Sequence, residues 1–135
     1  MQLNVTTDYG IRVILYLAQK NGAASSSEIC EKMGIPQSYM HKIAKTLKKA
    51  GMIREIRGSK GGFELKKDPN SLSILTIVNA FEKTTKINKC LEKDKFCSRD
   101  AKLCCGVRDL YAEIQTELDN RLDVKISTFL NDGDC

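Results

Sequence analysis

The sequence predicts a mainly α-helical protein with one small β-hairpin and a long helix near its C-terminus. Two observations support this fold class. Apolar residues recur every three or four positions in five separate segments, as one face of an α-helix requires. Between the third and fourth segments the period changes to two, and a glycine-rich turn interrupts the alternation. With 135 residues, of which 41% are hydrophobic, the chain is long enough to form one domain with its own core.

The first two helices are predicted from apolar spacing and from the residues that begin a helix. A helix is expected over residues 6–20, with Thr6 or Thr7 as its N-cap. A short second helix follows in SSSEICEKMG. There Ser25 and Glu28 have the spacing of a capping box, in which each side chain binds a backbone N–H group near the other residue.

A third helix and a hairpin come next. The helix is expected over about residues 37–50, and one stripe of it is apolar, formed by Met40, Ile43, Ala44 and Leu47. The segments MIREIR and FELKK then alternate apolar and charged residues on either side of GSKGG. This pattern predicts two short strands joined by a tight turn.

The second half of the chain is expected to hold a short helix, a cysteine-rich loop and a long helix. The segment SLSILTIVNAFEK predicts the short helix, with Ser71 or Ser73 as its cap. Apolar residues from Val107 to Leu130 predict a helix of about 24 residues, near 36 Å in length. A long amphipathic helix often pairs with a partner subunit, although it can also fold back on its own domain. We therefore divide the chain into residues 1–67, 68–105 and 106–135.

The charge is distributed unevenly between the two halves of the chain. Residues 1–67 hold 12 Lys or Arg against 5 Asp or Glu, whereas residues 68–135 hold 10 against 12. This asymmetry favours a polyanion partner for the first half, and the alternative is a solvated lysine surface. The sequence shows neither a membrane-spanning stretch nor the basic start of a signal peptide, so a cytoplasmic location is expected.

The order helix, helix, turn, helix, hairpin is that of a winged helix-turn-helix domain, which binds double-stranded DNA. One α-helix fits the major groove, and the third helix carries polar and basic residues opposite its apolar stripe. The hairpin tip is small enough to approach a minor groove. The candidate DNA-binding residues are Ser38, Tyr39, His41, Lys42, Lys45, Lys48, Lys49, Arg57, Ser59 and Lys60. Side chains at the start of the helix are expected to read bases, and the later lysines to contact phosphates.

Four of the six cysteines lie in the segment CLEKDKFCSRDAKLCC, residues 90–105, which we call the cysteine loop. Three interpretations compete: a disulfide staple, a metal or iron–sulfur site, and a redox thiol. A reducing cytosol disfavours the staple. Zinc is a rival metal, but its ligand pairs usually have two to four residues between them, and no such pair occurs here. The adjacent pair Cys104-Cys105 is the candidate for the redox thiol.

An enzyme is the contrasting class of function. The sequence has no cysteine-pair motif of the oxidoreductase type, no nucleotide-binding loop and no histidine near a nucleophile. A thiol–disulfide enzyme would also leave the lysine-rich third helix and the hairpin unexplained. We therefore do not expect enzymatic activity.

Several runs of residues resemble the Rrf-two family of bacterial transcription regulators. They are TDYGIRVILYLA near the N-terminus, IPQSYMHKIAKTLKKAG over the third helix and IREIRGSKGGFEL over the hairpin. The resemblance covers about residues 1–130. This sequence has Met40 where the family pattern has Leu, and Phe63 where it has Tyr. The resemblance implies a homodimer in which the long C-terminal helix crosses to the partner.

The resemblance also implies an iron–sulfur cluster. Cluster-binding members carry three cysteines between the short helix and the dimer helix, usually with five residues between neighbours. Here Cys90, Cys97 and Cys104 match in order and place, but six residues separate each pair. This departure leaves open whether a cluster would be of the 2Fe–2S or the 4Fe–4S type.

The fourth ligand of such a cluster differs between members of the family. IscR-like members use a histidine three residues after the third cysteine, and that position is Val107 here. NsrR-like members use an aspartate of the other subunit, and Asp8 stands at the matching position. Cys105 is the rival donor, and Asp8 can instead be an acid that favours the start of its helix.

The expected function is therefore a homodimeric DNA-binding regulator, a repressor, controlled by a cluster in the cysteine loop. It would bind a pseudo-palindromic operator whose half-sites lie about 34 Å apart. The alternative is a winged-helix regulator without a cluster that senses through thiol redox chemistry, zinc or a partner protein.

Overall fold

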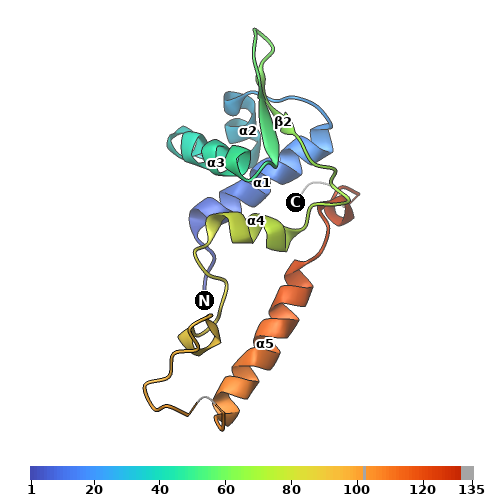
Figure 1. Ribbon diagram of the computed structural model, residues 1–135. Coiled ribbons are helices and arrows are strands. Elements are labelled where there is room, and N and C mark those ends of the chain that lie inside the picture. The colour runs from blue at the N-terminus through green and yellow to red at the C-terminus, as the bar shows by residue number, and fades with distance from the viewer. Residues whose placement is uncertain (102, 132–135) are drawn as a thin grey trace.

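The computed structural model confirms a mainly α-helical fold with one β-hairpin (Figure 1). It describes residues 1–101 and 103–131. In chain order the elements are α1 (Val5–Lys20), α2 (Ser26–Met33), α3 (Gln37–Lys49), β1 (Ile53–Ile56), β2 (Gly62–Leu65), α4 (Ile74–Phe81), the 3₁₀ turn η1 (Lys89–Leu91), α5 (Gly106–Leu122) and the 3₁₀ turn η2 (Ile126–Phe129).

Helix α1 begins earlier than the sequence indicated. Its N-cap is Asn4, whose side-chain oxygen accepts hydrogen bonds from the backbone N–H and the hydroxyl of Thr6. The prediction that Thr6 or Thr7 caps this helix was wrong. Both threonines lie buried in its first turn, and the Thr7 hydroxyl instead donates to the Glu82 carboxylate at the end of α4. Asparagine is a better N-cap than threonine, so the local preference at this site also favours Asn4.

Helix α2 has half of the predicted capping box. The Ser25 hydroxyl accepts from the backbone N–H of Glu28 at 3.1 Å, as expected. The Glu28 carboxylate does not reach back to Ser25, because it accepts hydrogen bonds from Lys20 and from the Tyr16 hydroxyl, both at 2.6 Å. The side chain that was predicted to cap α2 therefore ties α2 to α1.

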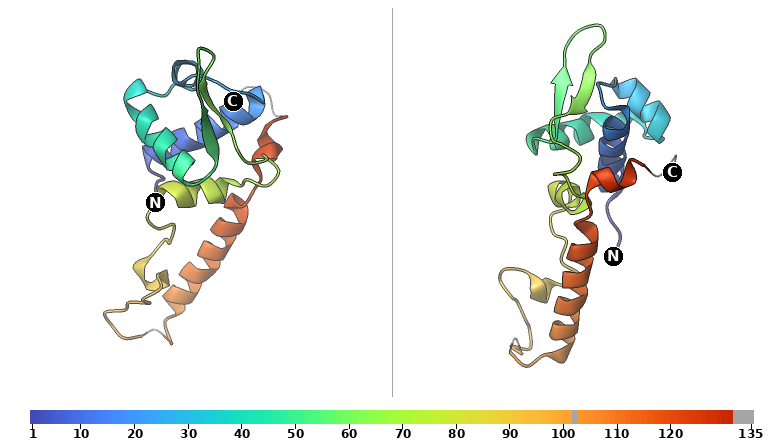
Figure 2. Two further views of the ribbon diagram at one scale, coloured as in Figure 1. Left: turned by 45° about the horizontal axis from the view of Figure 1, so that its top comes forward. Right: turned by 90° about the vertical axis from the view of Figure 1, so that its right-hand side faces the viewer.

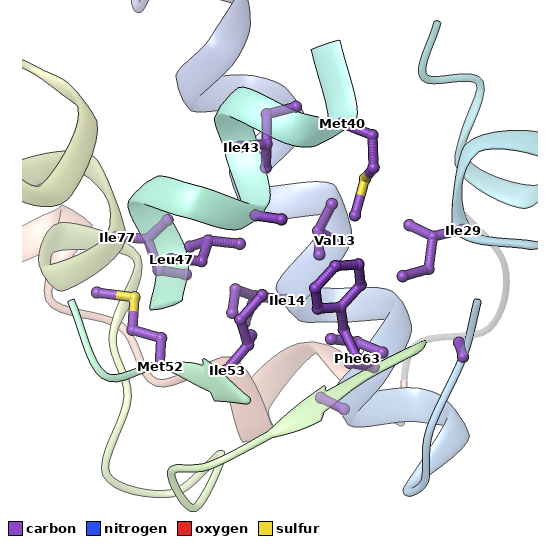
Figure 3. Close-up of a cluster of buried hydrophobic side chains, with 14 of the residues drawn as sticks. Val13, Ile14, Ile29, Met40, Ile43, Leu47, Met52, Ile53, Phe63 and Ile77 are labelled. Atoms are coloured by element: carbon purple, nitrogen blue, oxygen red, sulfur yellow. The ribbon is translucent and has the colours of Figure 1, made fainter. Parts of the chain in front are cut away.

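The core is built around α1, which packs against α2, α3, α4, β2 and η2. Val13 and Ile14 of α1 are completely buried, and the predicted apolar stripe of α3 meets them (Figure 3). All four residues of that stripe are buried. This burial fixes the orientation of α3, so its opposite, polar face is directed away from the domain.

The hairpin is antiparallel, with Ile53 opposite Leu65, and it is anchored to the connection between α1 and α2. The backbones of Ala24 and Phe63 exchange two hydrogen bonds of 2.9 and 2.8 Å. Gly62 makes this contact possible, because it has φ +153° and a Cβ atom there would lie 2.1 Å from the Ala24 carbonyl oxygen. The hairpin, which we call the wing, is therefore held at its base along the β2 edge.

Helix α5 is shorter than predicted. It ends at Leu122 after 17 residues, and the expectation of one helix from Val107 to Leu130 was wrong. The backbone beyond it pairs with the start of α4: Ile74 N–H donates to Val124 at 3.0 Å, and Ile126 N–H donates to the Leu72 carbonyl at 2.9 Å. Ile126 is then fully buried in the core. The apolar residues after Leu122 thus pack on the domain of α1–α3, and residues 132–135 lie outside the described chain.

The DNA-binding candidates and the cysteine loop lie at opposite ends of the molecule (Figures 1 and 2). The wing and α3 form one end. From there α5 extends away beneath α4, and the cysteine loop lies at its far, N-terminal end. In the part of the chain that the structure describes, no helix has the length and apolar character needed to cross a membrane.

Candidate DNA interface and cysteine loop

The polar face of α3 is open to solvent. Ser38, His41 and the lysines at positions 42, 45, 48 and 49 are exposed, as the apolar stripe on the opposite side requires. Tyr39 differs, since it is half-buried and its ring packs edge-on against Tyr9 of α1 at 5.2 Å between ring centroids. Tyr39 therefore also supports the packing of α3 on α1.

Lys48 is engaged within the protein, whereas its neighbour Lys49 forms no ion pair with any residue that the structure describes. The Lys48 ammonium lies 3.1 Å from the Glu55 carboxylate of β1 and 5.8 Å from the ring centroid of Phe63. These contacts place Lys48 at the edge of α3 beside the base of the wing. They also neutralise part of its charge, which sequence reasoning alone did not indicate.

The tip of the wing carries the predicted small and basic residues. Arg57, Ser59 and Lys60 are all exposed. Gly58 has φ +113°, and a Cβ atom at Gly61 would lie 2.3 Å from the Ile56 carbonyl oxygen. The narrow turn therefore depends on glycine at these positions, and it extends the charged side chains beyond the body of the domain.

Asp8 is placed in the first turn of α1, where its carboxylate forms an ion pair with Arg12 at 2.7 Å. Arg12 also donates to the Met33 carbonyl at 3.0 Å and lies 5.3 Å from the centroid of the Tyr9 ring. It thereby links α1 to the end of α2. The i,i+4 spacing of Asp8 and Arg12 is visible in the sequence, but no local pattern indicates that Arg12 binds the Met33 carbonyl.

The thiols of the cysteine loop are accessible but dispersed. Cys104 is exposed, and Cys90, Cys97 and Cys105 are half-exposed and unpaired. Among residues 1–101 and 103–131, no three Cys, His, Asp or Glu side chains are placed so that they share a metal ion. The donor chemistry suits an iron–sulfur cluster. Within one chain, however, the thiols are too far apart to share a metal ion, and Asp8 of the same chain does not join them in such a group.

Cys97 differs from the other loop cysteines in its backbone surroundings. The N–H groups of Ala101 and Arg99 are directed at its sulfur and lower the pKa of the thiol, with smaller contributions from the Arg99 charge and the Asp100 N–H. The turn that brings them there has a hydrogen bond of 3.1 Å from Asp100 N–H to the Cys97 carbonyl. Cys30, in contrast, is buried in α2, and burial raises its pKa. A lowered pKa increases the fraction of Cys97 present as thiolate near neutral pH, and the thiolate is the form that binds metals and reacts as a nucleophile.

Polar contacts fasten the connection between α4 and the cysteine loop to α5. Arg108 donates to the Cys90 carbonyl at 3.4 Å. Gln115 accepts from Ile87 N–H at 2.9 Å and donates to the Thr85 carbonyl at 3.1 Å. Neither side chain can be identified from the sequence, because an Arg and a Gln in a polar helix have no distinguishing local signal.

A family model described as an iron-dependent transcriptional regulator, Rrf2, matches residues 3–131. The chain belongs to the Rrf2 family. This confirms the resemblance that the motifs of α1, α3 and the wing indicated. Membership in the Rrf2 family establishes the chain as a transcription regulator of the DNA-binding type, with dimers typical of the family.

Solved structures of Rrf2 regulators have the same fold. The global cysteine regulator CymR of B. subtilis has a TM-score of 0.80 and 20% sequence identity, with 99% of each chain covered. IscR of T. potens has a TM-score of 0.77 and 21% identity, covering 99% of this chain and 89% of that one. The oxidised form of S. aureus CymR has a TM-score of 0.76 and 21% identity over the whole of both chains.

We predict that Cys97 is alkylated at lower pH than an ordinary thiol. Because its pKa is lowered, the reactive thiolate persists as the pH falls below the usual range. The measurement is the rate of iodoacetamide labelling of each cysteine against pH, read by peptide mass spectrometry with N-acetylcysteine amide as the reference. Ala101→Pro removes the N–H group that lowers the pKa of Cys97 most, so the pH midpoint of labelling should rise. Ala101→Ser keeps this N–H group and should leave the midpoint unchanged. A Cys97 midpoint equal to that of the reference would contradict the assignment.

Proposed function

We propose that this protein is a homodimeric repressor whose affinity for its DNA operator is controlled by an iron–sulfur cluster in the cysteine loop. The observation that carries the proposal is the division of the molecule into two ends joined by α4 and α5. A basic helix and a charged wing tip form one end, and four accessible thiols form the other (Figure 1). The operator would be pseudo-palindromic, matching the two-fold symmetry of the dimer.

The proposed DNA contacts follow from the exposure of each side chain. Ser38 and Tyr39, in the first turn of α3, and His41 and Lys42 after them, would reach base edges in the major groove. Lys45 and Lys49 would bind phosphates on either side of that groove. Lys48 would contribute less, because Glu55 already holds its ammonium group. The wing tip would approach the adjacent minor groove through Arg57, Ser59 and Lys60.

The dimer interface is proposed to be the apolar stripe of α5. Val107, Leu110, Ile114 and Leu118 follow one another at helical spacing and keep 56, 52, 43 and 38% of their surface exposed. The stripe continues into an apolar groove of about 380 Å³ between α5, Val78 of α4 and the N-terminal residues 1–3. So much apolar surface on one helix is typical of an interface with a second copy.

Cys90, Cys97 and Cys104 are the proposed ligands of the cluster, and its fourth ligand would be Asp8 of the partner subunit or Cys105. Thiolates are the usual ligands of such clusters, and a cluster supplies a centre whose redox state or loss reports the signal. Since the thiols are dispersed in the single chain, the loop would have to close to hold it. A conformational change on loading is what a regulatory site requires.

A second candidate is regulation by thiol oxidation without a cluster. The lowered pKa of Cys97 supports it, as does the exposure of Cys104 beside Cys105. In this alternative the Cys97 thiolate is oxidised to a sulfenic acid by a peroxide, which is reduced to water or an alcohol. A neighbouring thiol then condenses with the sulfenic acid to form a disulfide, with loss of water.

Lys49→Ala should lower the dependence of DNA affinity on salt by about one unit of log–log slope, because one phosphate contact is lost. Glu55→Gln should raise the affinity, since it frees Lys48. The measurement is binding to a duplex selected from a random pool by the wild-type protein, at several salt concentrations.

The matched control is Lys93→Ala, which removes the same charge from the exposed cysteine loop at the opposite end. If Lys49→Ala and Lys93→Ala reduced the slope of log affinity against log salt concentration equally, net charge and not contact by α3 would set the affinity.

Ile114→Glu should separate the dimer, because it places a charge in the middle of the apolar stripe. We expect the dissociation constant to rise about 100-fold or more, as for a central interface residue. Sedimentation velocity over a range of protein concentrations measures it. Asn120→Glu adds the same charge to an exposed position of α5 outside the stripe and should leave the dimer intact. A dimeric Ile114→Glu protein would place the interface elsewhere.

Anaerobic loading with ferrous iron and sulfide should give a coloured protein that holds iron and sulfide in a fixed ratio. Single Cys→Ser changes at positions 90, 97 and 104 should each reduce this iron content, and Cys30→Ser should not. Asp8→Ala and Cys105→Ser distinguish the two candidates for the fourth ligand. A colourless protein that binds zinc or no metal would overturn the cluster proposal and leave thiol oxidation as the mechanism.

A further inference from the structure

Gln115 is the one buried residue of α5, with 4% of its surface exposed. A helix whose large apolar residues are exposed and whose buried residue is an amide reverses the usual arrangement. A buried amide is retained without cost only when its hydrogen bonds are satisfied. The partners of Gln115 therefore indicate what this residue holds.

The Gln115 amide binds the backbone of residues 85–87, which precede the cysteine loop in the sequence, whereas Gln115 follows it. Its oxygen accepts from Ile87 N–H at 2.9 Å, and its nitrogen donates to the Thr85 carbonyl at 3.1 Å. One side chain therefore binds both a donor and an acceptor of the segment 85–87. The nitrogen also donates to the Asp119 carboxylate at 2.8 Å, which orients the amide. Asp119 in turn lies 3.5 Å from the Lys86 ammonium.

The segment held by Gln115 joins the domain of α1–α3 to the first thiol of the cysteine loop. At one end, the Glu82 carboxylate accepts from Asn4 N–H at 2.8 Å and from the Thr7 hydroxyl, at the start of α1. At the other end, the Cys90 carbonyl accepts from Arg108 of α5. The segment between Glu82 and Cys90 transmits a displacement only if a contact in its middle fixes its conformation. Without such a contact, rotation about its backbone bonds absorbs the displacement.

We propose that Gln115 is a positioning residue that couples the state of the cysteine loop to the DNA-binding end of the molecule. It clamps residues 85–87 to α5, so that a movement of Cys90 shifts α4 together with α5 and reaches α1 through Glu82. This inference rests on the proposed function, in which the cysteine loop controls DNA affinity. An amide suits the role, because it accepts from one backbone group and donates to the other, which a carboxylate cannot do.

The first test uses the reduced, metal-free full-length protein. Gln115→Leu has a similar size and removes all three hydrogen bonds, and Asn120→Leu at an exposed position of α5 is the matched control. Amide hydrogen exchange should accelerate about tenfold or more at Ile87 and also at Asn4, whose N–H binds Glu82. A role confined to local stability would accelerate Ile87 alone. An unchanged rate at Asn4 would therefore overturn the clamp.

The second test measures coupling. The affinity for a duplex selected by the wild-type protein is compared between the reduced protein and two other states, loaded with iron and sulfide or oxidised with diamide. In the wild-type protein, the affinity of the reduced state and that of at least one of the other two states should differ by about tenfold or more. The ratio of the two affinities should fall towards one in Gln115→Leu. In Gln115→Glu, which keeps the acceptor for Ile87, the ratio should lie between one and the wild-type value. Gln115→Glu also serves if the leucine variant does not fold.

The outcomes separate this inference from the proposed function. A wild-type ratio of one in both states means that the cysteine loop does not control DNA affinity, and both proposals fail. A large wild-type ratio that persists in Gln115→Leu leaves the proposed function standing and removes the clamp. A ratio lost in Gln115→Leu and kept in Asn120→Leu supports both.

Discussion

The structure depends on the packing of α1, because most of the other elements of the core contact this one helix. α2, α3, β2, α4 and η2 each pack on this one helix, so its apolar residues fix how they lie relative to one another. At Gly10 the ring of Phe81 from α4 lies so close that a Cβ atom would come within 2.4 Å of it. The contact leaves no room for another side chain in the middle of α1. It joins the helix that orients α3 to the helix that leads to the cysteine loop.

This packing explains how the two ends of the protein are related. α3 presents its lysines because its apolar stripe is buried against α1, and α4 is held at the start of the same helix by Phe81 and Glu82. Any change in the angle of α4 therefore acts on the N-terminal part of α1. Packed cores respond to such changes by moving rigid elements, since their interiors deform little. In the proposed function, a change at the cysteine loop would reach α3 through these contacts.

The cysteine loop has a different physical character from the domain to which it is attached. Its thiols are accessible, and its ordered contacts are backbone turns and bonds to α5. A segment with few buried apolar contacts has low local stability, so it can be rearranged by a ligand or a covalent change without unfolding the core. The lowered pKa of Cys97 arises within this loop, from the N–H groups of Ala101 and Arg99. The accessible thiols and the packed core therefore belong to parts of the molecule with different local stability.

The sequence by itself determined the type and order of the elements, the buried stripe of α3, the hairpin and the family, because these depend on local periodicity and on short motifs. The start of α1 was predicted wrongly, although asparagine is a better N-cap than threonine and the signal at Asn4 was present in the sequence. Only the tertiary structure decided that α5 ends at Leu122 and that Ile126 returns to the core. The helical spacing continues past that point, and the pairing of residues 124–126 with the start of α4 overrides it. Gln115, Arg12 and the pairing of Lys48 with Glu55 likewise depend on contacts between residues far apart in the sequence or on neighbouring elements, which no local pattern records.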